Sequence, residues 1–204
     1  MPNTKSSKSS PKLAGHAGHT QDSDVKGLSG SMHRPIKLTM LGAGSVFTPR
    51  LVNDVLRIPG NQGGVIALVD IDRSRLSTML RLIRKLVLKL GAEKKWKVIA
   101  SPDRTEVLKA SDYVINCIEV SGLACVYPDN DIPLKYGIDQ CIGDTIGPGG
   151  LFKTLRTAPV FVAALHDCER LCPQAIVLNY TNPMAMMCTS AGRASSMHVV
   201  GLCH

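Results

Sequence analysis

Aromatic residues are scarce in this chain of 204 residues, and they make up only 4% of it. Single-strand nucleic-acid binding uses aromatic side chains interleaved with basic ones, a pattern that so few aromatics cannot supply. Apolar runs are short, and none reaches the roughly 18 residues of a membrane span. No apolar stretch follows the N-terminal lysines, which argues against a secretory signal. We therefore predict a cytoplasmic protein that binds neither nucleic acid nor membranes.

The formal net charge of +8 is concentrated in one segment. Residues 73–97 contain nine Lys or Arg and a single acid, Glu93, so this segment alone carries a net +8. Leu76, Leu80 and Ile83 recur in it at helical spacing. We interpret its basic residues as the solvated face of an amphipathic helix rather than as a nucleic-acid surface.

Cysteine is present seven times, an odd number that fits reduced thiols better than a disulfide framework. Cys168 and Cys172 lie four residues apart in a helical pattern, a spacing that could share a metal ion. No second pair of ligands follows them, so we interpret most of the cysteines as small core residues.

The chain divides into a leader and one domain. Residues 1–33 hold hardly any large apolar residue, which predicts a disordered leader. From residue 34 to 204, short apolar segments alternate with segments of helical periodicity, which predicts a doubly wound, parallel, Rossmann-like α/β sheet. The expected strands are 36–41, 65–69, 97–100, 112–118, 175–180 and 199–202. The expected helices are 49–58, one within 73–97, 104–110, 151–171 and 183–194.

The first expected strand runs directly into the turn Gly-Ala-Gly-Ser at 42–45. In nucleotide-binding folds, such a turn lets a pyrophosphate approach the N-terminus of the next helix. The third small residue of the full fingerprint is replaced by Phe47. Asp70 ends the second expected strand, where a carboxylate would accept hydrogen bonds from the adenosine ribose and repel a 2′-phosphate. This pattern favours NAD over NADP; the alternative is that Asp70 begins a loop or caps the basic helix.

Four later segments and their order resemble one enzyme family. They are DTIGPGG at 144–150, LRTAP at 155–159, LNYTNPMAM at 178–186 and VGLCH at 200–204. The set resembles the family 4 glycoside hydrolases, particularly their α-galactosidase branch, and the resemblance extends over residues 36–204. It implies that Gly42, Gly44 and Ser45 line the phosphates of NAD.

The resemblance also implies a metal and sugar site. Asn182 would form hydrogen bonds with sugar hydroxyls near a divalent metal ion, usually Mn²⁺ in this family. Cys203 would be a ligand of that ion, although a thiolate is a softer ligand than Mn²⁺ prefers. His204 stands where some relatives place a catalytic group. Glu119 departs from the Arg or Gln that relatives often have, and an acid there disfavours a phosphorylated sugar.

The reaction that the resemblance implies starts with hydride transfer from sugar C3 to NAD⁺, which acidifies the proton on C2. A base, a tyrosine in relatives, removes that proton while the metal ion stabilises the enolate. The alcohol is eliminated, water adds, and NADH returns the hydride, so this family does not use the usual pair of carboxylates. The expected substrate is an α-galactoside or a related α-glycoside.

The base tyrosine and a second metal ligand of relatives lie beyond residue 204. We therefore expect this chain to be an N-terminal fragment that lacks the catalytic domain and activity, and the full-length protein to be a homo-oligomer. Two alternatives remain open. One is an NAD-dependent hydroxy-acid dehydrogenase of the lactate or malate type, and the other is a cofactor-binding remnant without catalysis.

Overall fold

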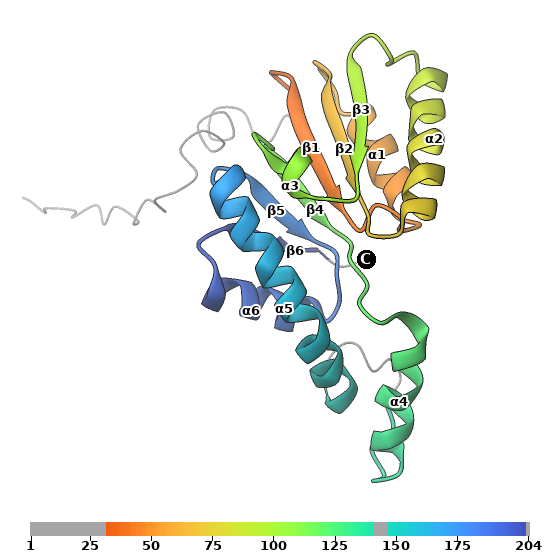
Figure 1. The fold of residues 1–204 in the computed structure, drawn as a ribbon, viewed down its shortest axis with the longest axis vertical. Coiled ribbons are helices and arrows are strands. Elements are labelled where there is room, and N and C mark those ends of the chain that lie inside the picture. Colours follow the sequence, from red (N-terminus) through yellow and green to blue (C-terminus); the bar gives the residue numbers. More distant parts are fainter. Residues whose placement is uncertain (1–31, 141–146, 203–204) are drawn as a thin grey trace, which may run out of the picture. The chain divides into compact units, whose positions relative to one another are not determined.

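The computed structural model describes residues 32–140 and 147–202, and six strands within these ranges form one parallel sheet (Figure 1). In chain order the strands are β1 (Ile36–Leu41), β2 (Gly64–Val69), β3 (Trp96–Ser101), β4 (Tyr113–Asn116), β5 (Ile176–Asn179) and β6 (His198–Gly201). Their order across the sheet is β3-β2-β1-β4-β5-β6, and every neighbouring pair is parallel. This arrangement confirms the predicted doubly wound, Rossmann-like fold.

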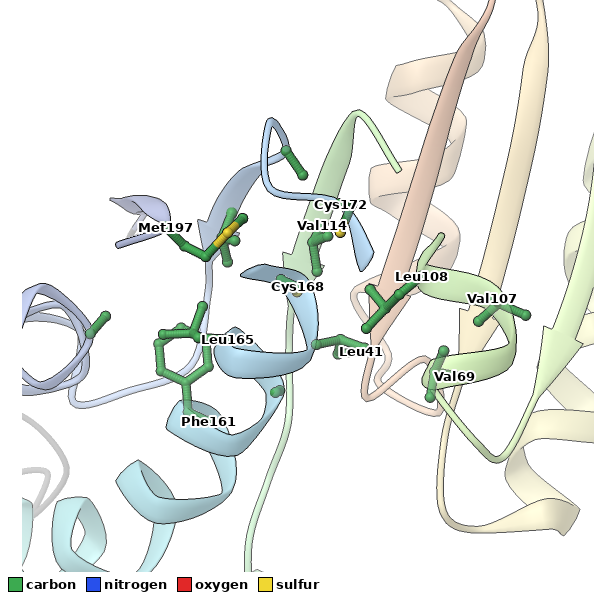
Figure 2. Close-up of a cluster of buried hydrophobic side chains, with 14 of the residues drawn as sticks. Leu41, Val69, Val107, Leu108, Val114, Phe161, Leu165, Cys168, Cys172 and Met197 are labelled. Carbon is green, nitrogen blue, oxygen red and sulfur yellow. The ribbon is translucent and has the colours of Figure 1, made fainter. Parts of the chain in front are cut away.

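Helices cover both faces of the sheet. Side chains along each strand alternate in direction, so apolar side chains lie on both faces and pack against helices there. On β1, Leu38 and Met40 pack against α1 (Thr48–Leu56) and α2 (Arg73–Lys89). Leu41 packs on the opposite face with residues of α3 (Thr105–Leu108), α5 (Pro148–Leu171) and α6 (Met184–Ala194). Figure 2 shows this second cluster, in which Phe161, Leu165 and Cys168 of α5 are almost fully buried. Each large apolar side chain buried in this way contributes about 1.5–3 kcal/mol relative to its exposed state.

The basic helix α2 begins at a capping residue. Asp72 accepts hydrogen bonds from the backbone N–H groups of Ser74 and Arg75 at 2.9 and 3.0 Å, which satisfies two free donors of the first turn. Its buried side chains recur at helical spacing and are Leu76, Met79, Ile83 and Val87. The basic side chains of α2 are exposed, so the helix is amphipathic as predicted.

Helix α4 (Gly122–Leu134) was not expected from the sequence, because Pro128 and Pro133 lie inside it and it shows no clear apolar face. It packs against α5. Arg156 of α5 forms a bidentate ion pair with Asp129 of α4, with Nη1 2.9 Å from Oδ1 and Nη2 bonded to Oδ2. Gln140 adds a bridge, since it donates to the Asp129 carbonyl and accepts from the Gly149 N–H. Tertiary contacts therefore hold a helix whose sequence alone is a poor helix former.

The expected leader, residues 1–33, falls outside the described residues except at its end. Met32 is buried in the core beside α1 and α2, and its N–H donates to the Pro59 carbonyl at 2.8 Å. The packed part of the chain thus reaches at least to residue 32, two residues before the expected boundary at residue 34. Over residues 32–140 and 147–202, no helix is both long enough and apolar enough to span a bilayer.

Candidate functional site

The turn after β1 packs directly against the segment that follows β4. Gly42 adopts a φ of +74°, which favours glycine. A Cβ atom at this position would lie 2.5 Å from the Cys117 carbonyl oxygen and 2.8 Å from the Ile118 nitrogen. The Ala43 N–H donates to the Val69 carbonyl at 2.8 Å, which ties the turn to the end of β2. The turn therefore lies where β1, β2 and β4 end, which is the point in this strand order at which ligands bind.

Asp70 links the glycine turn to the start of the segment before α2. Its Oδ2 accepts a hydrogen bond from the Gly44 N–H at 2.7 Å, and its Oδ1 accepts one from the Asp72 N–H at 2.9 Å. Asp72, rather than Asp70, caps α2. The sequence left open whether Asp70 caps the basic helix; the structure shows that Asp72 is the cap and that Asp70, partly exposed, lies beside the turn.

The glycine turn leads into the N-terminus of α1. Ser45 Oγ accepts a hydrogen bond from the Phe47 N–H at 3.2 Å, and the Ser45 carbonyl accepts one from the Thr48 N–H at 3.1 Å. Thr48 is fully buried, and its Oγ1 has no hydrogen-bond partner within the described part of the chain. A buried hydroxyl without a partner is costly unless a ligand or water completes it.

A buried amide network joins the ends of β4 and β5, and the sequence analysis missed it. Asn116 Nδ2 donates to Asn179 Oδ1 at 2.9 Å and to Thr181 Oγ1 at 3.1 Å. Thr181 Oγ1 in turn donates to the Ile118 carbonyl at 3.0 Å. The sequence did carry a signal for this network, because two neighbouring strands both end in asparagine, and Asn116 pairs with Asn179 in the sheet.

Asn182 follows this network directly. It is half-buried and precedes Pro183 across a cis peptide bond. Because Thr181 is tied to the end of β4, Asn182 lies on the same edge of the sheet as the glycine turn. The predicted nucleotide residues and the predicted sugar residue are therefore brought to one edge, with β4 between them.

Glu119 lies one residue beyond Ile118, at this edge of the sheet. Its carboxylate is 3.3 Å from the ammonium group of Lys153 on α5, and its side chain is about half exposed. Lys153 is largely buried. The departure that the sequence shows at residue 119 therefore places an acid against a basic side chain of α5.

Cys203 and His204 lie outside the described residues. The chain leading to them is placed, since β6 pairs with β5 and the Leu202 N–H donates to the Asn179 carbonyl at 2.9 Å. Cys168 and Cys172 are both buried in the core, as expected. In the ranges 32–140 and 147–202, no three His, Cys, Asp or Glu side chains form a group that could hold a metal ion.

Cys117, beneath the glycine turn, gives the folded protein a pH dependence. Burial raises the pKa of its thiol to about 11, from an ordinary value near 9.0. The unfolded state therefore loses this proton first as the pH rises, and the stability that the buried thiol contributes below pH 9 is lost between pH 9 and about 11. We expect the free energy of unfolding to fall in this window by about 2 kcal/mol more in the wild type than in Cys117→Ala. Urea unfolding at pH 8, 9 and 10.5 measures the difference, and equal losses in the two proteins would contradict the assignment.

Comparisons with known proteins place this geometry in a family. Residues 37–204 match the family 4 glycosyl hydrolases. An α-galactosidase of Rhizobium meliloti (strain 1021) is 38% identical over 170 residues, which are 82% of this chain and 34% of that protein. An α-galactosidase of Bacillus subtilis (strain 168) is also 38% identical over 170 residues, 82% of this chain and 39% of that protein.

A solved structure is also similar to this chain. The 6-phospho-β-glucosidase from Thermotoga maritima, solved with manganese, NAD⁺ and glucose-6-phosphate, has a TM-score of 0.72 and 27% identity. The match covers 82% of this chain and 40% of that one. The chain thus spans well under half the length of these relatives. With residues 37–204 matched, it belongs to the family 4 glycosyl hydrolases.

Proposed function

We propose that this chain supplies the NAD-binding part, residues 34–204, of a glycoside hydrolase that acts on α-galactosides or related α-glycosides. The observation that carries the proposal is the meeting of the glycine turn, Asp70 and Asn182 at one edge of the sheet. Two relatives are α-galactosidases, and a solved relative holds NAD⁺ and manganese. A cytoplasmic location and a homo-oligomeric full-length protein are further parts of the proposal.

The residues at the turn fit a dinucleotide. Gly42 and Gly44 let the turn pack closely against Cys117 and Asp70, and Ser45 precedes the N-terminus of α1, whose dipole favours an anion. The partly exposed carboxylate of Asp70 would accept hydrogen bonds from the adenosine ribose. Thr48 Oγ1, buried without a partner in the described residues, is a polar atom that a bound ligand or its water would satisfy. When bound, NAD⁺ supplies a hydride acceptor.

The sugar side of the site would be held by residues of the chain that follow β5 and β6. Asn182 offers both a donor and an acceptor to vicinal hydroxyls of a sugar. The buried bonds from Asn116 and Thr181 fix the backbone before it, so its position is set by the sheet rather than by a free loop. Cys203 is proposed as a ligand of a divalent metal ion and His204 as a catalytic group.

The charge balance at Glu119 favours an uncharged sugar. The ammonium group of Lys153 faces the Glu119 carboxylate at 3.3 Å, so its charge is already balanced. A sugar phosphate that approached this edge would meet the half-exposed carboxylate and be repelled. We therefore propose a neutral glycoside as the substrate rather than a 6-phosphorylated one.

Replacement of Glu119 by glutamine tests this choice of substrate. The variant keeps the shape of the side chain and removes the negative charge that would repel a sugar phosphate. In the complete protein we expect the ratio of kcat/KM for p-nitrophenyl α-galactoside to that for its 6-phosphate to fall about tenfold, equal to about 1.4 kcal/mol. An unchanged ratio in Glu119→Gln would contradict the assignment.

The function as a whole is tested by calorimetric titration with NAD⁺, with and without Mn²⁺, together with a p-nitrophenyl α-galactoside assay. We expect residues 1–204 to bind NAD⁺ saturably without turnover, and the complete protein to hydrolyse the glycoside only when NAD⁺ and a divalent metal ion are both present. A folded chain that does not bind NAD⁺ would overturn the proposal. Turnover that survives exhaustive removal of NAD⁺ would overturn its mechanism.

A further inference from the structure

Arg75 lies at the glycine turn but belongs to none of the groups assigned above. A Cβ atom built on Gly44 would lie 3.1 Å from Arg75 Cβ and 3.3 Å from its Cδ, and the same point is 2.7 Å from Asp70 Oδ2. The aliphatic stem of Arg75 therefore runs past Gly44, on the side where the Asp70 carboxylate bonds the turn. A side chain in place of the hydrogen of Gly44 would collide with both.

The guanidinium group of Arg75 is held only loosely. Its Nε is 3.4 Å from Asp72 Oδ2, and the side chains of Arg75 and Asp72 are 73% and 46% exposed. Exposed ion pairs of this kind contribute little, so the guanidinium can move to a ligand at small cost. Its backbone is fixed, by contrast, because the Arg75 N–H donates to the capping carboxylate of Asp72 at 3.0 Å. The stem is anchored at the turn while the charged end stays available.

We propose that Arg75 is a cofactor-binding residue that covers the adenosine end of the dinucleotide. The inference rests on the proposed function, in which the dinucleotide lies on the glycine turn. Asp70 marks the adenosine ribose, and Arg75 adjoins Asp70 across Gly44, so its planar guanidinium reaches the adenosine side rather than the nicotinamide side. A guanidinium stacks on aromatic faces and attracts phosphates, and adenosine diphosphate presents both.

The other basic residues of α2 provide a matched control. Arg81 lies on the same helix about two turns further on and is exposed, and its only described side-chain bond is to Thr78 at 3.4 Å. Methionine in place of either arginine keeps an unbranched stem and a good helix former, and removes one positive charge. The two variants therefore differ in their position relative to the turn and not in their effect on net charge.

The test is calorimetric titration of the complete chain and its variants with NAD⁺ and with ADP-ribose. We expect Arg75→Met to raise Kd about fivefold for both ligands, by the same factor, and to leave the melting temperature of the ligand-free protein unchanged. Arg81→Met should leave both Kd values within twofold of the wild type. Equal effects of the two variants would overturn the inference, and so would a loss that affects NAD⁺ but spares ADP-ribose. If the folded wild-type chain binds neither ligand, the proposed function itself fails and this inference fails with it.

Discussion

Alanine in place of Gly42 is expected to lower the free energy of unfolding by about 2–5 kcal/mol and to weaken NAD⁺ binding at least tenfold. Two costs add in the folded state. A non-glycine residue at a φ of +74° costs about 1–2 kcal/mol. The new methyl group would lie 2.5 Å from the Cys117 carbonyl oxygen, which is backbone and can move only with β4, and such overpacking costs about 1–3 kcal/mol. Binding falls because relief of the clash moves the turn away from the helix N-terminus.

The control for Gly42 is Gly91, which ends the turn after α2. It has a similar φ of +64°, and nothing lies within 4 Å of the position that its Cβ would occupy. Gly91→Ala therefore has the backbone strain without the clash, and we expect a loss of about 1–2 kcal/mol and unchanged NAD⁺ affinity. Urea unfolding and calorimetric titration measure both quantities. Equal losses in the two variants would mean that Gly42 serves backbone conformation alone and not the close approach of the turn to β4.

Much of the fold could be predicted from the sequence because the strands are short and mainly apolar. The strand bounds in the structure differ from the expected ones by two residues at most. Helix α2 could be predicted equally well, from the helical spacing of its apolar side chains. Helix α4 was not, because the interactions that hold it, Asp129 with Arg156 and Gln140, join residues 11 or more positions apart. Local patterns carry no trace of such tertiary contacts.

The site could be predicted only in part for a similar reason. The glycine turn and Asp70 carry a local pattern, whereas the bonds from Asn116 to Asn179 and Thr181 join residues that are 63 and 65 positions apart. Arg75 was counted only as one charge on a solvated face. Its contact with Gly44 depends on the path of the chain between β2 and α2, which Asp72 sets as the helix cap. These residues come together at the carboxyl edge of the sheet, although they are far apart in the sequence.

Asparagine in place of Asp70 is expected to shift cofactor preference towards NADP⁺ by about tenfold, equal to about 1.4 kcal/mol. The amide oxygen can still accept the Gly44 N–H that Asp70 Oδ2 accepts at 2.7 Å, so the turn should keep its shape. The amide nitrogen cannot accept the Asp72 N–H that Asp70 Oδ1 accepts at 2.9 Å, so that bond is lost in the variant. The variant also loses the negative charge that we propose lies beside the ribose 2′-hydroxyl and repels a 2′-phosphate. The Kd values for NAD⁺ and NADP⁺, measured by calorimetry, give the shift directly.

Asp72→Asn is the matched control for Asp70, since it removes the same charge two residues away. Asparagine caps helices as well as aspartate does, so α2 should remain capped. Because Asp72 bonds Ser74 and Arg75 rather than the turn, we expect its ratio of Kd values to stay within threefold of the wild type. Equal shifts in both variants would attribute the preference to net charge around the site. A shift confined to Asp70→Asn would instead mean that the Asp70 carboxylate, which bonds the turn at Gly44, also excludes the 2′-phosphate. The geometry of the turn and the choice of cofactor would then depend on the same side chain.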